Sequence, residues 1–457
     1  MNMFNHTLSA GLGPSWKAAR RDTPGIVLTR KIEFLLLLGA VFFCSMNYFR
    51  YGDTNFTVAD VLALLCFCFA LLNRNIDFQL FGRLSSGLWW LGLTMLVFGL
   101  LASSIAGPDP MRGVVIVTQY LYAYLFVVLL FSGRTLDQLV LLAKTYVFSI
   151  LVLCFQGIYL IHIDGRTNTN FVSGNGRFSG LMERENECAA VIALAVPILL
   201  LLITTKRINR VFATFALLIL IYGILLTGSN TGLIALVFGM TVFTVIGVNW
   251  KRLVVHVALI AGLILAVGTS ARDYLPTAFQ KRVLGALESG DIGQAGTFDH
   301  RVELIYEAMN MTDSTLLLGV GADQYRLASA IHQPVHNLYL LLWTEGGLIS
   351  AIGLLVMLLS AFGPALVVAR VPGGRPFTGC IVASVSMLLL VANAVPHAYS
   401  RFWPFPFVLP VALACAYVAL ARSAKAAPDS VAQPEPVAQP DLRPQAPMAR
   451  ARPGVRR

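Results

Sequence analysis

Twelve long apolar runs constrain the fold of this chain more than any other feature. One bilayer crossing needs about 20 mostly apolar residues. Only 12% of the 457 residues are charged, about half the share found in soluble domains. We therefore predict an all-α polytopic integral membrane protein of about 12 transmembrane helices, which excludes a soluble enzyme, a disordered chain and a single-anchor protein. The runs are 32–49, 57–73, 86–106, 113–132, 138–162, 188–205, 211–228, 231–249, 253–270, 338–369, 377–395 and 402–420.

The distribution of Lys and Arg orients these predicted spans. Residues 1–31 are basic and carry no small-residue cleavage pattern, so we expect them to remain as a cytoplasmic N-terminal segment. An even number of spans then places both termini in the cytoplasm, and 22 of the 34 Lys and Arg residues fall on that side. The net charge of +11 is thus interpreted as a topology signal, not as a nucleic-acid site.

Three segments lie outside the simple up-and-down pattern of the transmembrane domain, 32–420. The Pro-, Ala- and Arg-rich segment 421–457 is expected to be a disordered cytoplasmic tail. Two outer segments, 163–187 and 271–337, interrupt the spans, and the second is too long for an ordinary connection, which indicates function. Its apolar residues recur at helical spacing over 301–311, so we predict a partly helical outer loop.

Basic residues accumulate on the expected outer face, against the usual bias toward the cytoplasm. A guanidinium group matches phosphate oxygens bidentately, and a lipid phosphate or pyrophosphate is the natural anion at a membrane surface. The alternative, that some of these arginines pair with nearby carboxylates, remains open. The residues are Arg166, Arg177, Arg184, Arg272, Lys281, Arg282, Arg301, Arg326 and Arg401.

Five of the seven histidines fall on the same side, and the context of His336 distinguishes it. His336 and Asn337 end the long outer segment, and an apolar run begins at Leu338. An imidazole with an ordinary pKa near 6.5 can accept a proton at neutral pH. By position alone, the role of an interfacial helix cap is favoured over that of a base. The five histidines are His162, His300, His332, His336 and His397.

The sequence around this histidine resembles that of a known family. His336-Asn337, followed after nine residues by Gly347, resembles the signature of bacterial O-antigen ligases, in which Gly, Thr or Tyr stands where this chain has Ser350. Arg177-Phe178-Ser179-Gly180, leading to Asn186, is similar to a pattern of the superfamily that also contains O-antigen polymerases and protein O-oligosaccharyltransferases.

Two further blocks extend the resemblance to about 165–355. The predicted helix opening at Arg301 and running to Gly319-Val320-Gly321 is similar to the outer-loop block of the family. The segment 227–232 resembles another block, although Asn230 stands where many members have Arg. A further phosphate contact at this position therefore stays open.

The resemblance implies a GT-C-like, metal-independent and inverting glycosyltransferase without a cofactor. It would transfer a glycan from undecaprenyl pyrophosphate to the lipid A core oligosaccharide. The reaction would take place at the periplasmic face of a Gram-negative inner membrane, where the protein also contacts membrane lipids. Positive charge would stabilise the pyrophosphate leaving group, and a base would activate the acceptor hydroxyl. The implied catalytic residue is His336, the implied pyrophosphate contacts are Arg177, Arg184 and Arg301, and the implied supporting residues are Asn337, Asn186 and Gly347.

Other functions remain open at this stage, as does the oligomeric state. A polymerase or a protein O-oligosaccharyltransferase would use the same donor, and the short outer loops slightly favour a lipid acceptor. A non-catalytic lipid or solute transporter would predict inverted repeats and charges at the midplane. A metal-dependent transferase would draw on Glu183, Glu185 and Glu187, whose positions at a helix start are also favoured by the helix dipole.

Overall fold

The computed structural model describes residues 24–51, 56–182, 184–248, 275–290 and 298–431, and its architecture is helical. Two-residue strands β1 (Arg50–Tyr51) and β2 (Phe56–Thr57) pair antiparallel. Short 3-10 or π-helical turns are η1 (Tyr122–Phe126), η2 (Leu160–Asp164), η3 (Gly180–Met182) and η5 (Gln280–Leu284). The α-helices are α2 (Pro24–Phe43), α3 (Val58–Leu72), α4 (Arg83–Ala106), α5 (Pro110–Leu121), α6 (Val127–Leu129), α7 (Leu136–Tyr159), α8 (Glu185–Thr204), α9 (Arg210–Thr227), α10 (Asn230–Gly247), α12 (Thr277–Phe279), α13 (Gly285–Ser289), α14 (Phe298–Thr312), α15 (Tyr325–Ala328), α16 (Leu338–Leu359), α17 (Phe362–Ala369), α18 (Arg375–Val391) and α19 (Pro404–Val431).

The helices occur where the apolar runs predict them. Eight helical segments in the described chain are long and apolar enough to cross a membrane, and α3 and α18 are apolar but shorter. This is consistent with an integral membrane protein. The expected span 253–270 lies outside the described residues, so the total of 12 stays a prediction. The amphipathic helix expected over 301–311 is confirmed as α14.

Three boundaries differ from the sequence-based expectation. Helix α2 begins and ends earlier than the run 32–49. Arg30 and Lys31 are exposed, so the helix can include them although they lie outside the apolar run. The run 338–369 is interrupted at Gly347, whose φ of 72° and ψ of 172° are not helical. Helix α19 continues to Val431, past the expected boundary at 420, since the Ala, Lys and Arg residues there are strong helix formers. The remainder of the expected tail, 432–457, lies outside the described residues.

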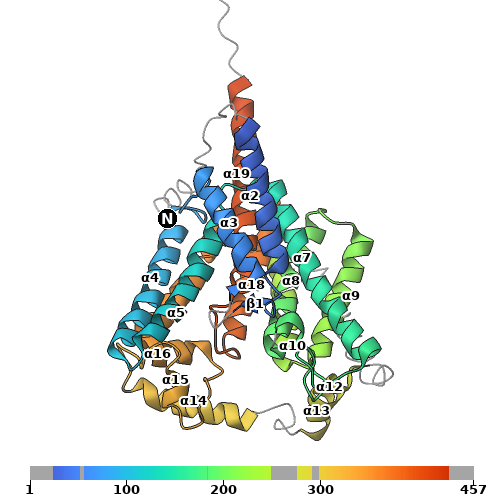
Figure 1. The fold of residues 1–457 in the computed structure, drawn as a ribbon. Helices are drawn as coiled ribbons and strands as arrows, with labels where there is room; N and C mark the ends of the chain where they lie inside the picture. The colour runs from blue at the N-terminus through green and yellow to red at the C-terminus, as the bar shows by residue number, and fades with distance from the viewer. Residues whose placement is uncertain (1–23, 52–55, 183, 249–274, 291–297, 432–457) are drawn as a thin grey trace, which may run out of the picture.

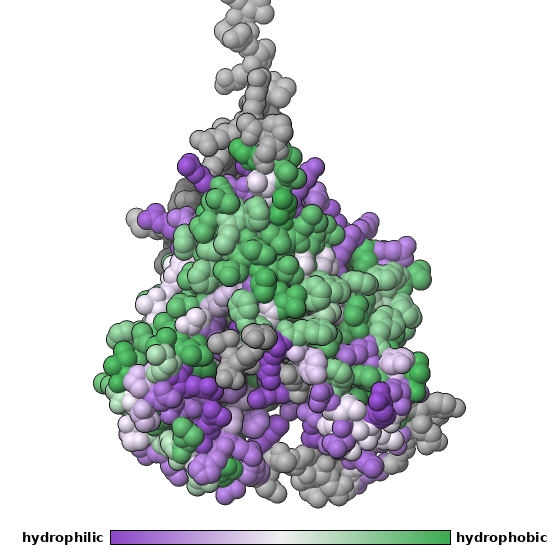
Figure 2. Space-filling model, in the orientation of Figure 1, coloured by the Kyte–Doolittle hydropathy of each residue, from purple (hydrophilic) through white to green (hydrophobic). Residues whose placement is uncertain are grey.

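The helices form a bundle with two distinct ends (Figure 1). Helices α4, α5 and α16 form one flank, α7 to α10 form the other, and α2, α18 and α19 lie between them. We call the end at which α2 begins and α19 ends the α2 end. The opposite end, which carries α12 to α15, is the α14 end. Figure 2 shows apolar surface over the middle of the bundle and polar surface gathered at the α14 end.

Helix α8 forms the centre of the packing. Every residue from Glu187 to Leu202 is buried, so this helix has no exposed face in its central turns. It packs against α7, α9, α10, α18 and α19. A helix that is apolar on all sides is suited to such a central position.

Two carboxylates near helix ends are buried in ion pairs. The Glu33 carboxylate lies 2.5 Å from Arg134 at the α2 end and also accepts a hydrogen bond from Asn73. Asp60 accepts a 3.0 Å bond from Nε of Arg401. Pairing with an arginine inside the protein is the reason that both acids are tolerated here.

Candidate active site

The α14 end brings together segments that are far apart in the sequence. Leu304 and Ala308 of α14 pack with Tyr325, Val335 and Leu341 in a separate apolar cluster. Because Val335 directly precedes His336, this cluster fixes α14 next to the start of α16. Figure 2 shows the polar surface at this end hollowed between the side that carries α14 to α16 and the side that carries α12 and α13.

Arg177 is buried and its guanidinium is engaged by the protein. Its Nε donates to the Thr227 carbonyl at 2.8 Å, and its Nη2 donates to Oδ1 of Asn186 at 3.0 Å. Nη1 lies 3.7 Å from the Glu185 carboxylate. The side-chain oxygen of Asn186 also accepts from Ser229 Oγ at 2.9 Å. Arg177 and Asn186 therefore join the loop before α8 to the end of α9 and the start of α10.

Three arginines approach one another closely enough to interact electrostatically. Burial lowers the pKa of Arg177 to about 10, Glu185 opposes this effect, and Arg282 and Arg301 lower it further. Burial also lowers the pKa of Arg301, as does repulsion from Arg282. Burial lowers the pKa of Arg282, and the charge of Glu185 opposes this effect by raising it. A cluster of this kind, which we call the arginine cluster (Arg177, Arg282, Arg301), would be stabilised by a bound anion.

Arg184 occupies the N-cap position of α8, and its side chain is 55% exposed. Its Nη1 lies 3.9 Å from Glu187 Oε1 in a loose ion pair. An exposed guanidinium with so weak a partner can turn toward a ligand at little cost.

His336 lies immediately before α16 and is half-buried. Its Nδ1 is buried and has no hydrogen-bond partner among the described residues. Burial lowers the pKa of His336 to about 4, repulsion from Arg301, Arg184 and His300 lowers it further, and the Pro334 backbone opposes these effects. The ring is therefore neutral at pH 7 and can accept a proton.

Asn337 caps α16. Its side-chain oxygen accepts hydrogen bonds from the Tyr339 and Leu340 amides, both at 3.1 Å. The Leu338 amide donates to the Ala392 carbonyl at 2.8 Å, which ties this turn to the end of α18. Asn337 therefore positions His336 by holding the backbone beside it.

Gly347 ends the first part of α16 and contacts the outer segment. A Cβ atom at this position would lie 2.1 Å from the Leu317 carbonyl oxygen. The Leu348 amide donates to Leu316 at 3.0 Å, and Ser350 Oγ donates to the Leu96 carbonyl of α4 at 3.1 Å. The nine residues between Asn337 and Gly347 form a helix about 14 Å long, so their number sets the distance of His336 from this fixed point.

Two residues not singled out from the sequence also belong to the site. One is Arg282 of the arginine cluster. The other is His397, half-buried between α18 and α19, whose ring centroid lies 5.0 Å from that of Tyr399. Burial lowers the pKa of His397 to about 3, with further repulsion from Arg184 and His336. In the sequence, the only sign that either residue belongs to the site is its expected location on the outer face.

The acidic residues of the site pair with arginines. Within the described ranges, no group of three or more His, Cys, Asp or Glu side chains could hold a metal ion. Glu185 and Glu187 face Arg177 and Arg184, and Glu183 lies outside the described residues. Chemically, the arrangement offers an anion-binding group of arginines beside a neutral imidazole.

Comparison with known families gives one match. Residues 214–358 match the family model described as O-antigen ligase, and this range contains Arg282, Arg301, His336 and Gly347. The comparison with curated proteins gave no match. Members of the matching family are glycosyltransferase-like ligases and polymerases. Over this stretch, which is less than half of its length, the chain is similar to the O-antigen ligase family.

Proposed function

We propose that the protein is an O-antigen ligase that transfers a glycan from undecaprenyl pyrophosphate to the lipid A core oligosaccharide. The observation that carries the proposal is a neutral His336 placed within the electrostatic reach of Arg184 and Arg301, in a stretch that matches the O-antigen ligase family model. A pyrophosphate donor needs positive charge, and a hydroxyl acceptor needs a base.

In the proposed reaction, the acceptor hydroxyl oxygen attacks the anomeric carbon of the donor glycan. The bond from that carbon to the pyrophosphate oxygen breaks, and the hydroxyl proton moves to His336. Direct attack inverts the anomeric configuration and releases undecaprenyl pyrophosphate. Arg301, Arg282 and Arg184 would stabilise the departing anion.

Arg177 has a more internal part in this proposal. Its hydrogen bonds to Thr227 and Asn186 are directed into the protein. It would therefore hold the surrounding segments in place for the other two arginines of the cluster. Its charge still adds to the field at the pyrophosphate. Asn186 and Asn337 position the two sides of the site, and Gly347 fixes the length of the helix that begins after Asn337.

The same arginines would regulate the basicity of His336. The charges of Arg301 and Arg184 disfavour a proton on the ring. A bound pyrophosphate would offset their charge and thereby raise the pKa of His336. The base would then be strongest when the donor is in place.

We place the α14 end at the periplasmic face of the inner membrane and both termini in the cytoplasm. The support is the bias of Lys and Arg toward the α2 end. A polymerase or a protein O-oligosaccharyltransferase is the alternative, since the superfamily includes ligases and polymerases and the arginine cluster does not specify the acceptor.

Deletion of the gene tests the ligase proposal against the polymerase. A ligase mutant would lose polymer from mature lipopolysaccharide and accumulate full-length polymer on the lipid carrier. A polymerase mutant would instead lose the long chains on the carrier itself, and that result would overturn the ligase assignment.

The pH dependence of transfer should follow His336. The active form is neutral, so activity is lost as the pH falls through the pKa, and a pKa lowered to about 4 moves this loss well below the ordinary 6.5. Arg301→Gln removes a repulsive charge, so the acid limb of kcat/KM should shift to higher pH. Arg166→Gln, which changes an exposed arginine paired with Asp164, is the control and should leave the limb in place. An unchanged limb in Arg301→Gln would contradict the proposed coupling.

A further inference from the structure

Three cavities at the α2 end share one wall residue, Arg207. The largest two have volumes of about 350 Å³ each, and the third has about 320 Å³. Such volumes lie at the lower end of the range for ligand sites. Each cavity lies between α7 or the residues just before it and Arg207, which follows α8. The end of α8 with α18 and α19 completes the first, the start of α9 the second and α19 the third.

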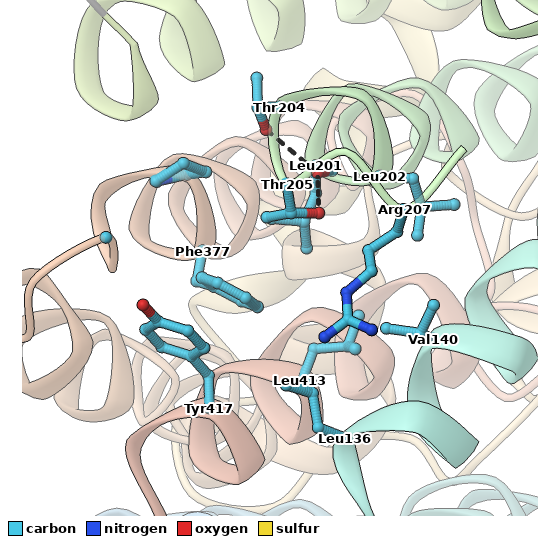
Figure 3. A pocket seen from close by; sticks show the side chains of 12 residues that line it. Leu136, Val140, Leu201, Leu202, Thr204, Thr205, Arg207, Phe377, Leu413 and Tyr417 are labelled. Carbon is cyan, nitrogen blue, oxygen red and sulfur yellow. Dashed lines mark hydrogen bonds between the residues drawn. The ribbon is translucent and has the colours of Figure 1, made fainter. Parts of the chain in front are cut away.

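The cavity walls are mainly apolar. In the first cavity, Figure 3 shows the Arg207 guanidinium reaching toward Leu136, Val140 and Leu413, with Phe377 and Tyr417 on another side. The two threonine hydroxyls of this wall donate to the Leu201 carbonyl within α8. The walls therefore suit hydrocarbon, and Arg207 supplies the charge.

The ion pair that Arg207 makes leaves it available to a ligand. Its Nη1 lies 2.9 Å from Asp137, but the two side chains are 40% and 84% exposed. A pair this exposed contributes little stability. Lys144 lines the second cavity with Arg207, and Lys206 and Arg210 lie close by in the sequence. Asp137 lines the third cavity and is the one carboxylate among the residues that line the three.

We propose that this surface binds an anionic phospholipid of the leaflet at the α2 end. Its phosphate contacts Arg207 and Lys144, and its acyl chains occupy the cavities that converge on Arg207. Cavities at the ends of membrane-spanning helices are open to lipid chains, and basic residues beside them select anionic headgroups. A zwitterionic lipid of the same chain length lacks the net charge that this arginine and lysine would complement. The site is independent of the glycosyltransferase proposal, since it lies at the opposite end of the bundle.

The purified full-length protein in detergent can be titrated with phosphatidylglycerol and with phosphatidylcholine of identical chains, and binding measured by native mass spectrometry. We expect the parent to prefer phosphatidylglycerol. Arg207→Gln should weaken phosphatidylglycerol binding by about tenfold, the typical value of one charge-assisted hydrogen bond, and leave phosphatidylcholine binding unchanged, which also verifies folding. Arg210→Gln, an exposed arginine that lines none of the three cavities, is the matched control and should bind as the parent does.

Asp137→Asn separates lipid binding from a purely structural ion pair. If Arg207 binds a lipid phosphate, the loss of its competitor should leave phosphatidylglycerol binding equal or stronger. Three results would overturn the proposal: equal binding of the two lipids by the parent, equal phosphatidylglycerol binding by Arg207→Gln and Arg210→Gln, or weakening by Asp137→Asn as large as that by Arg207→Gln.

Discussion

His336→Asn is expected to lower glycan transfer by about 10² to 10⁴, the usual contribution of a general base. Asparagine retains hydrogen-bonding capacity but cannot accept a proton at neutral pH. The Asn337 cap and the packing of Val335 do not depend on the imidazole, so the variant should fold and still bind the lipid donor. Transfer measured with purified protein, lipid-linked donor and core acceptor provides the rate, and donor binding is measured separately.

The matched control is His332→Asn. His332 lies on the same segment, is exposed, and has a φ of 57°, a conformation that asparagine tolerates well. Its loss should change transfer little. If the two variants lose activity equally, or if His336→Asn transfers at the rate of the parent, His336 is not the base.

Gly347→Ala is expected to destabilise the protein by about 3 kcal/mol or more. The φ of 72° and ψ of 172° at this position belong to a region that essentially only glycine adopts. The added Cβ would also overlap the Leu317 carbonyl at 2.1 Å, and backbone on both sides leaves little room to relax. Thermal unfolding in detergent should show a clearly lowered Tm or a loss of folded protein.

Gly87→Ala is the corresponding control on α4. A Cβ at Gly87 would meet nothing within 4 Å, and alanine favours a helix over glycine. This variant should be as stable as the parent or slightly more stable. A Gly347→Ala protein with the same Tm as Gly87→Ala would show that the break in α16 is not a fixed part of the fold.

The sequence predicts the helices well because apolar runs report directly on burial or lipid contact. The helix over 301–311 follows from periodicity alone and is observed as Phe298–Thr312. The break at Gly347 escapes this reasoning, since it does not interrupt the apolar run and the backbone direction there depends on the close approach of Leu316 and Leu317 in the folded chain. Hydropathy records what surrounds a residue, and it contains no information on backbone direction.

The candidate site is predictable only in part, for a related reason. His336 and the outer arginines can be named from their positions and from the family resemblance. Whether a guanidinium points inward, as that of Arg177 does toward Thr227 and Asn186, depends on segments that meet only in the folded chain. His397 joins the site in the same way, because the Leu338 amide binds the Ala392 carbonyl and brings the α18–α19 connection to the start of α16.

The complete burial of α8 has a consequence for how the chain is inserted. Two of the helices that cover it, α18 and α19, are synthesised only after the 170 residues between Thr204 and Arg375 have followed. Until then part of its surface must face lipid. No charged side chain occurs from Cys188 to Leu202. The helix can therefore stay in contact with lipid without exposing an unpaired charge to the bilayer. Helices α18 and α19 then replace the acyl chains that contact α8. No other protein is needed to shield polar groups of α8 during synthesis.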